Sequence, residues 1–165
     1  MSWVILDDAK TRDLSPEKRL EKYTDVIKNE KDASKRWDAI WLTGELARDV
    51  GRGPLFDKAA DLFVWNLEND DDGVVMHETC YQISACDMRE KIPDLLKAGL
   101  ENQSSLARHE AIEVLGSMEA FEVLDDLKKA LKDPVSYVVE TAKFAIKRLE
   151  RMQHRKGQYN LSEIL

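Results

Sequence analysis

Apolar residues recur every three to four positions along most of the chain, which is the period of a helix packed on one face. The segment 55–67 shows this period, and the segments 92–100 and 121–131 repeat it. No segment alternates apolar and polar residues as a half-buried strand does, and no hairpin signal is present. The pattern therefore predicts an all-α protein.

Four short stretches between these segments align with one another. They begin at Trp37, His77, His109 and Val139, at intervals of 40, 32 and 30 residues, and Gly44 and Gly116 share one offset in two of them. The longer first interval contains the loop sequence 51–54. Repeated two-helix units of this length stack into a solenoid. We expect about eight helices in four antiparallel pairs, an α-solenoid with the aligned stretches on its inner helices.

Prolines and short polar residues indicate where the helices begin. Pro16, Pro93 and Pro134 stand near expected helix starts, where the missing N–H costs little, and Ser15 and Asp133 are candidate N-caps. We predict a single domain over residues 1–165, with repeats at about 15–50, 55–87, 91–118 and 120–152, and a polar tail at 153–165.

Composition excludes several classes of protein. The net charge of −7 opposes nucleic-acid binding and is compatible with a cationic ligand. Residues 1–8 lack the basic start and long apolar stretch of a signal peptide, and no apolar run approaches the roughly 18 residues of a membrane span. We therefore expect a cytoplasmic protein with no membrane association. Cys80 and Cys86 lack disulfide or zinc-site spacing and are predicted to be reduced and buried.

A histidine followed by a glutamate occurs twice at the repeat spacing, as His77-Glu78 and His109-Glu110. An acidic residue recurs in all four aligned stretches, but the histidine does not, so the scaffold does not require it. Stacked helices lie about 8–10 Å apart, so side chains of neighbouring helices can meet. We expect these four residues to bind metal, and imidazole with carboxylate favours iron or manganese. The alternative is a row of salt-bridged polar residues.

One helical turn after each histidine stands another polar residue, Tyr81 after His77 and Glu113 after His109. Glu113 is a candidate to hold a histidine N–H, as metal-bound imidazoles require. Tyr81 is a candidate to hydrogen-bond a substrate or an oxygen ligand. For both residues, a partly buried polar side chain in the groove wall is the alternative.

At these residues the chain resembles the deoxyhypusine hydroxylase family, di-iron monooxygenases built of HEAT repeats, here of the PBS-lyase type. The resemblance spans roughly residues 35 to 152 and rests on Arg108-His109-Glu110-Ala111 with Glu113 and Leu115-Gly116, on His77-Glu78 with Tyr81, and on Asp133-Pro134-Val135 with Val139-Glu140-Thr141. It implies iron ligands or substrate-contacting acids at His77, Glu78, His109 and Glu110. The catalytic candidates are then Glu78, Glu110, Tyr81 and Glu113.

The resemblance also implies partners. A family enzyme has two such halves and four couplets, whereas this chain has two couplets, so a homodimer would restore the set. The expected cofactor is iron, either two ions shared in the homodimer or one per chain. The expected substrate is a translation initiation factor carrying deoxyhypusine, whose cationic side chain suits an acidic groove. The alternatives are a non-catalytic HEAT-repeat scaffold and a di-iron protein that binds oxygen or iron.

Overall fold

The computed structural model describes residues 8–158, which form two compact units divided between Lys91 and Ile92. Within residues 8–158 every regular element is helical and no strand occurs, which confirms the all-α prediction. None of the described helices combines the length and apolar character that a membrane span needs. The expectations for residues 1–7 and 159–165 lie outside the described part.

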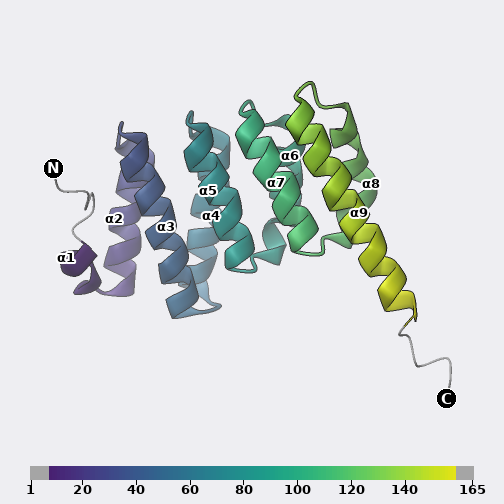
Figure 1. The fold of residues 1–165 in the computed structure, drawn as a ribbon. Helices are drawn as coiled ribbons and strands as arrows, with labels where there is room; N and C mark the ends of the chain where they lie inside the picture. The colour runs from purple at the N-terminus through teal and green to yellow at the C-terminus, as the bar shows by residue number, and fades with distance from the viewer. Residues whose placement is uncertain (1–7, 159–165) are drawn as a thin grey trace, which may run out of the picture. The chain divides into compact units, whose positions relative to one another are not determined.

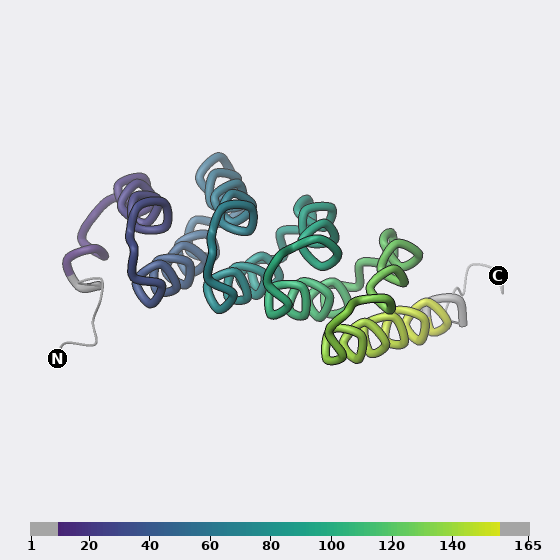
Figure 2. Tube along the Cα trace, turned by 90° about the horizontal axis from the view of Figure 1, so that it is seen from above, coloured from purple at the N-terminus to yellow at the C-terminus, as the bar shows by residue number. Residues whose placement is uncertain are grey.

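The first unit contains the short helix α1 (Asp8–Arg12) and two helix pairs. These are α2 (Pro16–Asn29) with α3 (Ala33–Val50), and α4 (Pro54–Asn69) with α5 (Gly73–Ala85); a 3-10 turn follows at Arg89–Lys91. Within this unit α3 and α5 lie side by side in one layer, and α2 and α4 form the other (Figures 1 and 2). The large side chains between the layers, among them Tyr23, Ile40, Phe63 and Ile83, are fully buried.

The second unit repeats this plan. Helix α6 (Ile92–Glu101) pairs with α7 (Ser105–Ser117), and α9 (Ser136–Gln158) packs beside α7 (Figure 1). Between α7 and α9 the chain forms a 3-10 turn (Phe121–Val123), the single-turn helix α8 (Leu124–Leu127) and a second 3-10 turn (Lys128–Lys132). The four predicted helix pairs are therefore present, with α8 as the shortest member.

One helix prediction was wrong in detail. The segment 121–131 is not one α-helix but is divided by the two 3-10 turns, the second of which tightens the chain before Asp133-Pro134, where α conformation is disfavoured. Residues 153–158, which were predicted to begin a polar tail, belong to α9, since this helix continues to Gln158. Its good helix formers extend to Lys156, and no glycine interrupts them before Gly157.

The two glycines at one offset mark close helix approaches inside each unit. A methyl group at Gly116 of α7 would lie 3.0 Å from Cβ and 3.1 Å from Cα of Ala145 in α9. A methyl group at Gly44 of α3 would overlap the side chain of Gln82 in α5. The absence of a side chain at these positions lets the two inner helices of each unit approach closely.

Candidate metal centre

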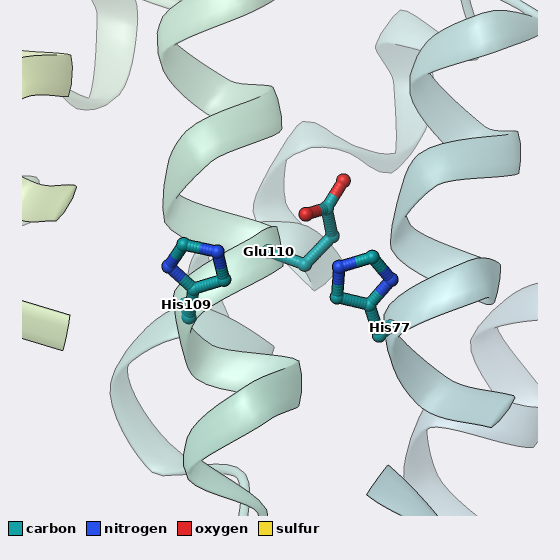
Figure 3. Close-up of side chains that lie close together, drawn as sticks. All are labelled: His77, His109 and Glu110. Atoms are coloured by element: carbon teal, nitrogen blue, oxygen red, sulfur yellow. The ribbon is translucent and has the colours of Figure 1, made fainter. Parts of the chain in front are cut away.

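The two His-Glu couplets lie on α5 and α7, one in each unit, and share one pattern of burial. His77 and His109 are half-buried, whereas Glu78 and Glu110 are each 7% exposed. Successive helical residues differ by about 100° in direction, so each histidine points to the helix edge while its glutamate points inward. Figure 3 draws three of these side chains, His77 from α5 and His109 with Glu110 from α7.

The ring of His109 is held on two sides by α9. Its Nδ1 lies 2.6 Å from Oγ1 of Thr141, which itself donates a hydrogen bond to the carbonyl oxygen of Tyr137 at 2.9 Å. The Tyr137 ring meets the imidazole edge-on, with 5.8 Å between centroids, and its hydroxyl donates to Oγ of Ser105 at 2.6 Å. These contacts fix the orientation of the imidazole.

The other ring nitrogen of His109 faces its own helix. Nε2 lies 3.4 Å from Oε2 of Glu113, one turn further along α7, and Glu113 is exposed. Ligand atoms about 2.1 Å from one ion and separated by a tetrahedral angle lie roughly 3.4 Å apart. The spacing therefore suits a cation between the imidazole and the carboxylate, whether a proton or a metal ion.

In the first unit a hydrogen-bonded chain supports Glu78. Nε2 of Gln82 donates to Oε1 of Glu78 at 2.8 Å, and Nη1 of Arg48 in α3 donates to Oε1 of Gln82 at 2.8 Å. Gln82 is fully buried, so the buried carboxylate of Glu78 receives a fixed donor. Tyr81, the other candidate on α5, is 45% exposed, which leaves its ring accessible from solvent.

Each unit contains a buried ion pair between its two inner helices. The arginine lies near the start of the first inner helix, α3 or α7, and the aspartate lies in the loop before the second, α5 or α9. Arg108, the residue before His109, donates two hydrogen bonds to Asp133, from Nε at 2.6 Å and from Nη2 at 3.0 Å. Arg36 makes the equivalent pair with Asp70, both bonds being 2.8 Å. Asp133, predicted as an N-cap, instead stands three residues before α9, where it also accepts the N–H of Val135 at 2.8 Å.

These pairs change the acidity of their carboxyl groups. The hydrogen bonds from Arg108 lower the pKa of Asp133, and burial opposes the change without reversing it. Burial alone would raise the pKa of Asp70, but the hydrogen bonds and charge of Arg36, with further N–H donors, lower it overall. Both carboxylates are therefore held in the charged form.

Among the described residues, neither cysteine belongs to the group of candidate ligand atoms that lie close together. Cys80 and Cys86 are free and buried, as the sequence predicted. Burial raises the pKa of the Cys86 thiol, although Arg48 opposes the change, and a thiol with a raised pKa is a poor source of the thiolate that binds metals. The available donors are thus imidazoles and carboxylates.

Sequence reasoning missed Thr141, Gln82 and Arg48. Thr141 stands 32 residues after His109, the spacing of the two couplets, so the repeat period itself was a signal for this contact. Gln82 follows Glu78 by four residues, where side chains share a helix face. For Arg48 we find no comparable signal, because the 34 residues between it and Gln82 match no interval between the aligned stretches.

A sequence model of HEAT repeats matches residues 60–152 of the chain. Among curated proteins, deoxyhypusine hydroxylase of Saccharomyces cerevisiae is 31% identical over 136 residues, which are 79% of this chain and 42% of that protein. The enzyme of Danio rerio is 32% identical over 127 residues, 76% of this chain and 38% of that protein. The enzyme of Bos taurus is 38% identical over 91 residues, which are 54% of this chain and 30% of that protein.

The solved structure of human deoxyhypusine hydroxylase in complex with glycerol matches with a TM-score of 0.70 and 27% identity. The match covers 86% of this chain and 46% of the human chain. The resemblance noted in the sequence is thus confirmed, and the chain spans less than half the length of the relatives it matches.

Proposed function

The chain belongs to the HEAT-repeat family, and we propose that within it the protein is an iron-dependent hydroxylase of the deoxyhypusine side chain on a translation initiation factor. The observation that carries the proposal is the twice-repeated arrangement of a half-buried histidine beside a buried glutamate. The similarity to enzymes named deoxyhypusine hydroxylase supports it, over the part of their length that this chain spans.

The proposed iron ligands come from both couplets. His77, His109 and Glu110 offer two imidazole nitrogens and one carboxylate oxygen (Figure 3), and Glu78 offers a second carboxylate. This set of borderline nitrogen and hard oxygen donors fits ferrous iron. Bound iron would supply the redox chemistry that activation of dioxygen requires.

The remaining work belongs to the side chains of the protein. Where Glu78, which is oriented by Gln82, or Glu110 does not bind iron, its carboxylate is suited instead to hold an amine of the deoxyhypusine side chain by charge-assisted hydrogen bonds. Tyr81 is exposed and is the proposed contact to the incoming substrate or an oxygen ligand, whereas Glu113 is proposed to act beside the ring of His109. The net charge of −7 favours approach of a cationic side chain.

We further propose that two copies of the chain act together. The relatives are more than twice as long as the part that this chain matches. Two copies would supply four couplets, enough for a centre with two iron ions.

Metal analysis with native mass spectrometry tests the ligand assignment. Protein loaded with ferrous ion under anaerobic conditions should carry about one iron per chain and run as a dimer, as a shared di-iron centre requires. His109→Ala should lose most of this iron. His154→Ala, which removes an exposed histidine of α9 outside the couplets, should keep it. An iron-free wild-type protein after loading would exclude the proposal.

The reaction is tested separately by mass spectrometry of an initiation factor that carries deoxyhypusine. Incubation with the iron-loaded protein, oxygen and a reductant should add one oxygen atom to the modified lysine, and His109→Ala should add none. Iron binding without this addition would leave an iron- or oxygen-binding protein. A protein that neither binds iron nor adds oxygen to the lysine would be a non-catalytic scaffold.

A further inference from the structure

A hydroxyl group has one hydrogen, and this decides the direction of the hydrogen bonds around Thr141. Its Oγ1 lies 2.9 Å from the carbonyl oxygen of Tyr137, which can only accept, so the hydroxyl hydrogen points there. Towards Nδ1 of His109, 2.6 Å away, the same oxygen is then an acceptor. Nδ1 must therefore carry a hydrogen.

From this geometry we infer that Thr141 is a positioning residue that holds His109 in the tautomer protonated at Nδ1 and so directs the lone pair of Nε2 to the metal. The role as a metal ligand rests on the proposed function, whereas the tautomer rests on the hydrogen bonds alone. The hydrogen on a metal-bound imidazole must lie on the nitrogen that does not bind, and its partner tunes the affinity for the metal.

The surroundings of Thr141 make it suited to this task. The residue is 9% exposed, so water competes little for its hydroxyl. Its hydroxyl hydrogen is directed by the backbone of α9, whose position relative to α7 is set by the Arg108–Asp133 pair and by the contact between Gly116 and Ala145. Tyr137 blocks rotation of the ring from one side.

The assignment leaves Nε2 opposite a carboxylate. In the neutral ring with its hydrogen on Nδ1 this nitrogen is an acceptor, and it faces Glu113 at 3.4 Å. Two acceptors at this distance repel one another unless a cation lies between them. Thr141 therefore prepares, on α7, a pair of groups that favours a bound cation.

The test is the tautomer of His109 in the metal-free protein, read from the ¹⁵N shifts of the two ring nitrogens by long-range proton–nitrogen NMR. Spectra are recorded over a series of pH values, and the tautomer is read where the ring shifts show the neutral imidazole. His109→Gln identifies the signals. Wild type and Thr141→Ser should show hydrogen at Nδ1, and Thr141→Val should shift the population toward hydrogen at Nε2, because valine cannot accept a hydrogen bond.

Ferrous-ion titration under anaerobic conditions gives a second measurement. Thr141→Val should weaken binding about 10- to 100-fold, as for other outer partners of metal-bound histidines, and Thr141→Ser should restore it. Thr43→Val is the matched control, because buried Thr43 also donates to the carbonyl four residues back, at 2.7 Å, but lies on α3. It should leave the tautomer and the iron affinity unchanged.

The outcomes separate the two proposals. Hydrogen at Nε2 in the wild type, or a tautomer unchanged by Thr141→Val, overturns the positioning role. The inferred tautomer in a protein that binds no ferrous ion upholds the role of Thr141 on the ring and counts against the proposed function instead. Thermal unfolding of each variant shows that the spectra come from folded protein.

Discussion

Glu78 illustrates how hydrogen bonds from neighbouring side chains orient a single candidate ligand. A carboxylate that is 7% exposed loses most of its hydration, and burial of such a charge is costly unless donors replace the water. Gln82 provides one donor, and its own oxygen is in turn bonded by Arg48. Thr141 likewise forms a hydrogen bond with the ring of His109. In each unit, therefore, a neutral polar side chain fixes the direction of a candidate ligand.

Replacing Gln82 by leucine tests this arrangement at the residue scale. Gln82→Leu keeps the approximate volume but removes the donor to Glu78 and the acceptor for Arg48, so the free energy of unfolding should fall by about 1–3 kcal/mol. Iron affinity should fall with it if Glu78 is a ligand. Urea denaturation and ferrous-ion titration measure the two effects.

The control for that substitution is Gln153→Leu on α9. Gln153 is exposed, and surface substitutions of this kind change the free energy of unfolding by less than about 0.5 kcal/mol. Equal effects of the two variants would show that the Glu78 network contributes nothing measurable.

At the scale of elements, the spacing between inner helices depends on residues without side chains. Gly116 lets α7 approach the backbone of α9 at Ala145, and this contact and the hydrogen bond from His109 to Thr141 join the same two helices. The position of the donor to Thr141 is therefore coupled to the packing of a glycine seven residues away.

Gly116→Ala should move the two helices apart. The added methyl group would meet Cβ of Ala145 at 3.0 Å and its backbone Cα at 3.1 Å, and neither atom can move aside as the end of a flexible side chain does. The expected cost is about 1–3 kcal/mol of unfolding free energy, larger than the gain of up to about 1 kcal/mol in helix propensity. Denaturation measures the cost, and the His109 ring signals should shift.

Gly99→Ala provides the comparison on α6. Its methyl group would meet a side-chain atom of Ile112 at 3.1 Å, which can adjust, so the loss should be smaller. A Gly116→Ala protein as stable as wild type would mean that the close approach does not limit the spacing of α7 and α9.

At the scale of the whole molecule, both compact units contain one buried arginine–aspartate pair, Arg36–Asp70 in the first and Arg108–Asp133 in the second. Each pair ties the start of an inner helix to the loop before the next. Because the structure lowers the pKa of both aspartates, folding favours their charged form.

The stability of the protein should therefore depend on pH in the acid range. The contribution of these pairs is complete above the ordinary aspartate pKa of 3.8 and is lost as the pH falls through the lower values of the folded state. Asp133→Asn should cost about 3–5 kcal/mol at neutral pH, because it leaves Arg108 buried without its partner. The difference from wild type should shrink toward pH 3 in urea denaturation.

Asp125→Asn serves as the control, because Asp125 pairs with Lys128 on the surface. Its removal should change the stability little at any pH. A pH profile of Asp133→Asn that runs parallel to that of the wild type would contradict the assigned role of the pair.

The sequence by itself determined the helices, their pairing and the couplets, because these depend on local spacing. The 3.6-residue period places apolar residues on one face, and repetition at about 30–40 residues shows which helices are equivalent. The similarity of the couplets on α5 and α7 in burial follows from their equal positions in the repeat. The spacing of apolar residues did not predict the 3-10 turns in the segment 121–131, because a 3-10 turn keeps most of the apolar spacing of an α-helix.

Only the tertiary structure decided which groups hold the candidate ligands. Arg48 reaches Gln82 across 34 residues and Thr141 reaches His109 across 32, and such contacts depend on how closely two helices pack and in which rotation. The direction of one hydroxyl hydrogen then selects the nitrogen that His109 offers. No periodicity in the chain encodes that choice, because it arises from a hydrogen-bond geometry formed only after the helices have packed.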